Sequence, residues 1–194
     1  MSRFFAIVLT LFFVIDAFGH IPDYLNILKP YEGKKRLQIV IRELIFALVL
    51  MFVFHFVGSA LLTLLKISKS TVQISGGVVL FLIAIRLIYA TEEDKPKWAE
   101  HEPFIVPIAT PIIAGASSLA VIMIFSQETG AKFVTLCAIF LAWLASSIIY
   151  LFARPIYKIV TEKGLLASQR LMGLIVAIIA VQTAIEGLQG WMKT

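Results

Sequence analysis

Three long stretches of this chain contain no Asp, Glu, Lys or Arg: residues 44–65, 104–126 and 133–153. A bilayer with a hydrocarbon core about 30 Å thick is crossed by a helix of roughly 20 predominantly apolar residues, so each stretch is long enough to span it. Because lipid offers the backbone no hydrogen-bond partners, such segments must be helices. The sequence therefore predicts an all-α polytopic membrane protein that contacts membrane lipid.

The composition excludes several other classes of protein. Of the 194 residues, 60% are apolar and 15% are charged, which lies outside the range of soluble, disordered, collagen-like or nucleic-acid-binding chains. The single cysteine, Cys137, has no partner for an internal disulfide, and His20, His55 and His101 are far apart. We therefore expect no nucleic-acid partner, no metal site and no cofactor.

Three further segments, 4–28, 71–90 and 171–192, bring the expected number of membrane-spanning helices to six. Alternating the loops between the two sides places most of the basic residues together, and the positive-inside rule makes that side cytoplasmic. Both termini are then outside the cytoplasm. Reading the first segment as a cleaved signal peptide would leave Lys29, Lys34, Lys35 and Arg36 outside, against the same rule. The basic residues assigned to the cytoplasmic side are Lys29, Lys34, Lys35, Arg36, Arg42, Arg86, Lys95, Lys97, Arg154, Lys158, Lys163 and Arg170.

A hydrophilic stretch at residues 91–102 divides the chain into two halves of three spans each. Within a single membrane domain of residues 1–194, this predicts one repeat over about 1–90 and a second over about 103–194. An odd number of spans per repeat requires the two repeats to be inverted in the membrane. Weak internal similarity supports this, since Gly76 aligns with Gly173 at an offset of 97 and Gly19 lies at a similar offset from Gly115.

The first and fourth spans are interrupted at corresponding places, at residues 16–22 and 109–118. Pro111 removes a backbone donor and crowds the preceding turn, while Gly19 and Gly115 permit non-helical backbone angles. Broken helices at membrane depth are tolerated where they line protein or a water-filled cavity, and paired breaks are typical of the central site of a secondary transporter. We expect the following residues to line a substrate or ion site: Asp16, Gly19, His20, Thr110, Gly115, Ser117 and Ser118.

Asp16 has two interpretations, because it is an ionisable residue near the middle of a span. The functional one is proton coupling or substrate binding, since a carboxyl group is costly within the membrane. The structural one is that Asp16 caps the half-helix that follows by accepting free N–H groups near Gly19. The two roles are compatible.

Other polar and small residues have more ordinary interpretations. We expect His55 to make an interhelical hydrogen bond, and Arg42 and Glu43 to pair or extend to the interface. Small residues at helical spacing, such as Ala180 with Ala184, predict close helix packing. The Gly-Ala-Ser-Ser sequence at 115–118 resembles the nucleophile motif of rhomboid proteases, but neither later span carries the required histidine, so we expect no enzyme activity.

Several of these segments together resemble the MarC family of membrane proteins. Residues 16–22 read Asp-Ala-Phe-Gly-His-Ile-Pro against the family's Asp-Pro-x-Gly-Asn-x-Pro, and residues 107–117 resemble its Pro-Leu-Ala-x-Pro-Leu-x-Ala-Gly-Pro-Gly. A Gly-Gly stretch at 76–77 matches the start of the family's third span. Ala17, His20 and the pair Ala116 and Ser117 depart from the family pattern. The resemblance implies a bacterial inner-membrane protein, in a grouping with carriers of small neutral amino acids.

The sequence thus favours a secondary transporter of a small solute, with a small neutral amino acid and proton coupling as the specific expectation. The alternative is a non-transporting scaffold or assembly factor whose helix breaks are structural. A homo-oligomer is compatible with either. Buried polarity at both breaks favours the transporter.

Overall fold

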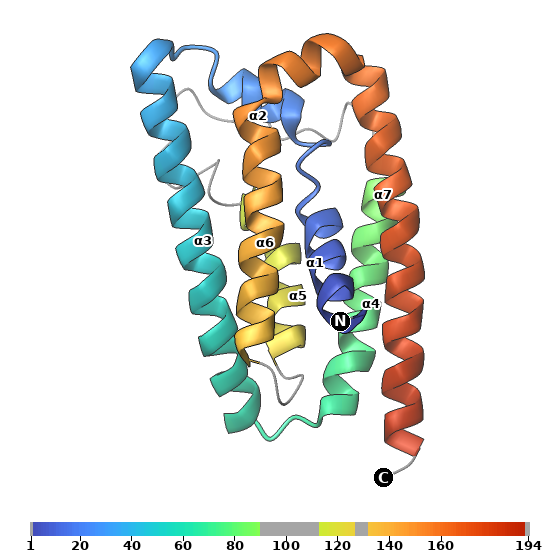
Figure 1. Ribbon diagram of the computed structural model, residues 1–194. Helices are drawn as coiled ribbons and strands as arrows, with labels where there is room; N and C mark the ends of the chain where they lie inside the picture. The colour runs from blue at the N-terminus through green and yellow to red at the C-terminus, as the bar shows by residue number, and fades with distance from the viewer. Residues whose placement is uncertain (1, 90–112, 127–131, 193–194) are drawn as a thin grey trace.

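The computed structural model describes residues 2–89, 113–126 and 132–192, and every regular element in these ranges is a helix (Figure 1). The predicted helical class is therefore confirmed. The helices are α1 Ser2–Ile15, α2 Ile21–Ile27, α3 Gly33–Leu64, α4 Lys69–Ile88, α5 Ala116–Ser126, α6 Lys132–Leu151 and α7 Ala153–Met192.

Four of these helices are long and apolar enough to cross a membrane: α3, α4, α6 and the part of α7 from Lys163 onward. α3 begins at Gly33 and not near residue 44 as expected, because the Lys, Arg and Gln residues that precede its apolar run are themselves good helix formers. α7 changes direction at Thr161, whose φ of 60° and ψ of 165° are not helical. The bend near the start of α7 is visible at the top of Figure 1.

α1 and α5 are shorter than a bilayer is thick, with apolar stretches at Phe4–Ile15 and Ser117–Ser126. They belong to the two spans predicted to be broken. The chain leaves the helical path at residues 16–20 before α2 begins, which confirms the first interruption. α5 begins only at Ala116, in line with the second, although most of residues 109–118 before that point lie outside the described ranges.

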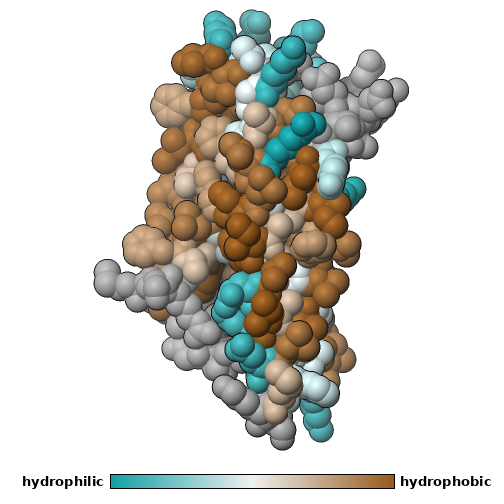
Figure 2. Space-filling view, turned by 90° about the vertical axis from the view of Figure 1, so that its right-hand side faces the viewer, coloured by the Kyte–Doolittle hydropathy of each residue, from teal (hydrophilic) through white to brown (hydrophobic). Residues whose placement is uncertain are grey.

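The outer surface of the bundle is apolar. Large hydrophobic side chains on α3, α4, α6 and α7 are exposed, and brown, hydrophobic residues cover most of the face in Figure 2, with hydrophilic residues at its upper end and in a second group in its lower half. Exposing so extensive an apolar surface to water is unfavourable, whereas contact with lipid tails is not. The chain is a multi-pass membrane protein.

α1 occupies the centre of the bundle and packs against α5, α6 and α7 (Figure 1). Its side chains Leu11 and Ile15 are almost fully buried, and the core continues through Ile21 and Leu28 in and after α2. A short helix so enclosed is stabilised by the helices around it and not by its own length. This position puts the end of α1 inside the protein.

α4 and α7 run antiparallel and pack closely along glycine residues. A Cβ at Gly77 would lie 2.8 Å from the carbonyl oxygen of Ala180, and one at Gly173 would lie 2.9 Å from the backbone nitrogen of Ile88. Such approach is the usual basis of helix association in lipid, where small residues bring backbones together. The predicted packing role of Ala180 and Ala184 is confirmed.

Candidate functional site

The interruption between α1 and α2 is organised by Asp16. Its backbone is in the left-handed region, with a φ of 48°, which Asp tolerates better than most residues. The backbone N–H of Gly19 donates to Asp16 Oδ1 at 3.2 Å, and that of His20 donates to the Asp16 carbonyl at 3.2 Å. Asp16 therefore accepts the Gly19 N–H as expected and closes the turn, but it does not cap α2, whose N-cap residue is His20.

The Asp16 side chain is completely buried, and only one of its oxygens is used by the turn. Within the described residues, Oδ2 makes no hydrogen bond of good geometry, although the Gln169 side chain lies close enough to interact with this carboxyl group. A buried carboxylate is normally paired or hydrogen-bonded on both oxygens, because removing charge from water is costly. The free Oδ2 is the feature of this turn that capping does not explain.

Two side chains from other helices lie beside this carboxyl group. The amide of Gln169, in α7, is next to Asp16, and the phenol of Tyr150, in α6, is close enough for the two groups to interact electrostatically. Tyr150 is fully buried and packs against Tyr24 of α2, with ring centroids 4.9 Å apart and ring planes tilted by 44°. Its hydroxyl, like Oδ2, lacks a hydrogen-bond partner in the described ranges.

α6 adds two more buried hydroxyls one turn before Tyr150. Ser146 and Ser147 are almost fully buried, and neither Oγ has a partner among the residues that the structure describes. In lipid-embedded helices such hydroxyls usually bond to a carbonyl one turn earlier or to a neighbouring helix. Together with Tyr150 they place several unsatisfied hydroxyls on the helix that packs most closely against α1.

The start of α5 contributes a second group of the predicted residues. Gly115 is buried, and its carbonyl accepts from the Ser118 hydroxyl at 2.9 Å and from the backbone N–H of Leu119 at 3.0 Å. Ser118 is buried and its hydroxyl is thus satisfied by its own segment, whereas Ser117 is half-buried. The Ser117 side chain is the more accessible of the two for a ligand.

The structure therefore arranges the predicted residues as two local groups on neighbouring helices. Asp16, Gly19 and His20 share the turn after α1, and His20, half-buried, occupies the N-cap position of α2 without a side-chain capping bond. α1 packs against α5, so the two groups belong to helices in contact. Thr110 lies outside the described residues. The residues beside the first group that sequence reasoning missed are Gln169, Tyr150 and Tyr24, whose proximity depends on contacts between distant parts of the chain.

Gly19 occupies a position where no side chain fits without moving the site. A Cβ there would overlap Asp16 Oδ2 and would lie 2.7 Å from Gln169 Cδ. We expect Gly19→Ala to displace the carboxyl group or the amide and to lower the free energy of unfolding by about 1–3 kcal/mol, the usual range for overpacking. Unfolding in mixed detergent micelles measures this, with Ala17→Gly as a backbone control. A Gly19→Ala protein as stable as wild type would contradict the close packing at this turn.

Two expectations about polar residues outside the turn had different outcomes. Arg42 and Glu43 do pair, with Arg42 Nη2 2.8 Å from Glu43 Oε1, and the glutamate is fully buried. The hydrogen bond expected for His55 was wrong for the described residues, since neither ring nitrogen has a partner there. Within the same ranges no group of three His, Cys, Asp or Glu side chains gathers as metal ligands would.

Comparison with known proteins gives consistent matches over the full length of the chain. The family described as MarC family integral membrane protein matches residues 1–192. A UPF0056 membrane protein of Buchnera aphidicola from Schizaphis graminum is 38% identical over 195 residues, covering 100% of both chains. The UPF0056 inner membrane protein YhgN of Escherichia coli K12 is also 38% identical, over 196 residues and 100% of both chains. A UPF0056 membrane protein of Methanocaldococcus jannaschii is 28% identical over 191 residues and 93% of each chain, and no solved structure matches significantly.

Proposed function

Because the chain belongs to the MarC family of integral membrane proteins, we propose that it is an inner-membrane secondary transporter of a small solute. The expected cargo is a small neutral amino acid and the expected coupling ion is the proton. In this proposal the protein performs no covalent chemistry, and both termini face away from the cytoplasm. The inner-membrane location is supported by the name of the Escherichia coli relative.

The observation that carries the proposal is the Asp16 turn. It interrupts an apolar helix inside the bundle and leaves a completely buried carboxyl oxygen without a partner in the described part of the chain. An ionisable group within a membrane-spanning region is costly and by default marks an ion or substrate pathway. A purely structural cap needs one acceptor oxygen, whereas the Asp16 carboxyl group also faces the Gln169 amide and the Tyr150 phenol.

The surrounding groups suit an amino-acid zwitterion. Asp16 Oδ2 and the Tyr150 hydroxyl can accept hydrogen bonds from an ammonium group. The start of α5, which is an N-terminal helix end beside the half-buried Ser117, offers partial positive charge to a carboxylate.

The arrangement of helices supports the inverted-repeat part of the proposal. α1 and α5 run in opposite directions, as do α4 and α7, and each pair joins corresponding members of the two predicted repeats (Figure 1). Inverted repeats place a transporter's binding site at their interface, near the middle of the bilayer. In this proposal the two interrupted helices, α1 and α5, lie at that interface and contact each other.

One observation favours the scaffold alternative. The Gly19 N–H and the Ser118 hydroxyl both find acceptors within their own segments, so part of each break is stabilised without any solute. Under this alternative the unpartnered hydroxyls of α6 would lower the free energy of unfolding without serving a function.

Solute flux separates the two candidates. Purified protein in liposomes should take up labelled glycine or alanine with saturation kinetics, and an imposed proton gradient should raise the initial rate. Empty liposomes give the background, and a bulky amino acid such as tryptophan tests the size limit. Flux that does not exceed the background for any small amino acid, in either direction of the gradient, would count against the transporter.

A further inference from the structure

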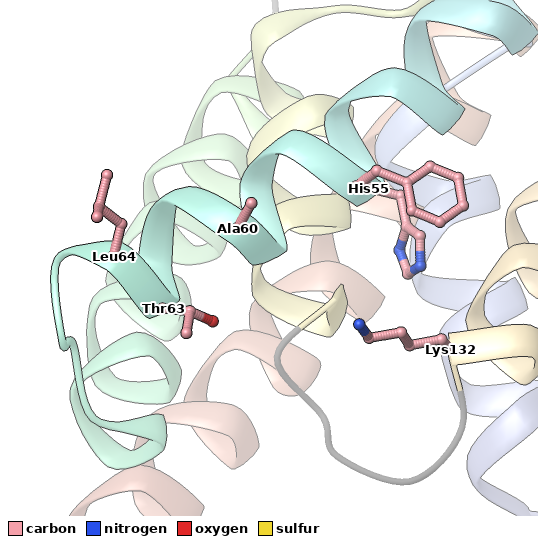
Figure 3. Close-up of a pocket in the computed structure, with 6 residues that line it drawn as sticks. His55, Ala60, Thr63, Leu64 and Lys132 are labelled. Carbon is pink, nitrogen blue, oxygen red and sulfur yellow. The ribbon is translucent and has the colours of Figure 1, made fainter.

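A pocket of about 450 Å³ lies between the last turns of α3 and the first residue of α6, away from the Asp16 turn. It is lined by His55, Phe56, Ala60, Thr63, Leu64 and Lys132. In Figure 3 the imidazole of His55 points from α3 toward Lys132, and the Lys132 amine extends toward the space beside Thr63. Two nitrogen-bearing side chains from different helices therefore converge on one cavity.

Nothing in the described residues explains why position 55 carries a polar side chain inside the bundle. It is 1% exposed, and both of its ring nitrogens lack hydrogen-bond partners in the described ranges. A neutral imidazole always carries one N–H donor, and leaving that donor buried and unused is unfavourable. An acceptor bound in the pocket would satisfy it.

The charge in the pocket is positive and its walls are apolar. Lys132 supplies an ammonium group whose electrostatic interaction reaches His55. Phe56 and Leu64 form walls that are also 55% and 78% exposed on the outside of the bundle, on the lipid-facing surface of α3. This combination suits a ligand with an anionic head and an apolar body.

The Lys132 end of the pocket lies at the depth of lipid headgroups. α6 has 20 residues, about 30 Å at 1.5 Å per residue, which matches a hydrocarbon core about 30 Å thick. Lys132 is the first residue of α6 and therefore lies at the edge of that core, and the pocket extends from it toward His55, near the middle of the uncharged stretch 44–65. A lysine at the edge of the hydrocarbon core extends its ammonium group into the headgroup region, where lipid phosphates lie.

We propose that this pocket binds the phosphate group of an anionic membrane lipid. Lys132 pairs with the phosphate, His55 donates its N–H to a phosphate oxygen, and the glycerol and first acyl carbons lie against Phe56 and Leu64. A free phosphate ion would fill only a small part of the cavity, so the lipid is the favoured source of the phosphate. This site is separate from the proposed transport site and does not depend on that function.

Native mass spectrometry of the full-length protein tests the proposal. Wild-type protein, purified in mild detergent, is titrated with phosphatidylglycerol, with zwitterionic phosphatidylcholine and with soluble glycerol phosphate. We expect one tightly bound phosphatidylglycerol, which the His55→Phe and Lys132→Gln variants each weaken about fivefold and the double variant by roughly 20-fold. Lys132→Arg should keep the binding because it keeps the charge, and Lys66→Gln, at the same end of the bundle but outside the pocket, is the matched control.

Helical content and monodispersity of each variant show that the protein is folded. Equal phosphatidylglycerol binding by wild-type and double-variant protein would overturn the site. An equal loss in Lys66→Gln would overturn it as well, because the attraction would then be a general property of the basic surface. Tighter binding of glycerol phosphate than of phosphatidylglycerol would overturn the lipid as the occupant.

Discussion

Asp16→Asn is expected to reduce proton-driven solute flux to the level of empty liposomes while the protein stays folded. The asparagine oxygen can accept the Gly19 N–H as the carboxylate does, since Asn is as good a cap as Asp, so the turn should be retained. We therefore expect the free energy of unfolding to change by less than about 1 kcal/mol. Unlike a carboxyl group, the asparagine amide does not take up or release a proton during transport. It also carries no negative charge with which to pair with an ammonium group.

The measurement is the initial rate of labelled glycine uptake into proteoliposomes, with and without an imposed pH gradient. Glu186→Gln is the matched control, because it neutralises another carboxyl group of the bundle that is exposed and bonded to Gln182. It should transport at the wild-type rate. Full gradient-driven flux in Asp16→Asn would reduce Asp16 to a helix cap and remove proton coupling from the proposal. Equal loss in both variants would show that any carboxyl replacement disturbs the fold.

The helical architecture was predictable because its signal is local. Uncharged stretches identify the long helices α3 and α6 directly, and the polar residues after Ile15 mark the end of α1. The hydrogen bond between Asp16 and Gly19 was also predictable, since its acceptor and donor are only three residues apart. Such features depend on spacing along the chain, which the sequence contains in full.

The surroundings of the turn were not predictable, because they depend on contacts between distant segments. Gln169 lies beside a basic residue at the edge of the last span, and nothing in its neighbourhood distinguishes it from a solvated helix end. Tyr150 and Ser146 lie in the uncharged stretch 133–153, where nothing in the local sequence distinguishes them from packing residues. His55 was expected to be satisfied because most buried polar groups are, and its unpartnered nitrogens became apparent only from the packing of α3 against its neighbours.

Gly77→Leu is expected to cause the largest loss of stability, about 3 kcal/mol or more, because its neighbours are backbone atoms. A Cβ at this position would lie 2.7 Å from the Ala184 nitrogen and 2.8 Å from the Ala180 carbonyl oxygen. Neither atom can move without shifting α7 as a whole, so the strain exceeds that of an ordinary overpacked core. Separating the helices there also weakens the contacts at Gly173 and Gly187, which depend on the same close approach.

The comparison is with Val78→Leu, which introduces the same side chain at the next residue, where the native valine is 54% exposed on the outer surface. The free energy of unfolding of that variant should lie within about 0.5 kcal/mol of the wild-type value, as is usual for surface substitutions. Reversible unfolding in mixed detergent micelles, followed by circular dichroism, measures both. Equal stability of the two leucine variants would contradict the close backbone approach of α4 and α7 at Gly77. If only Gly77→Leu unfolds early, the antiparallel α4–α7 pair is a rigid frame, and any motion in a transport cycle must occur in the other helices relative to it.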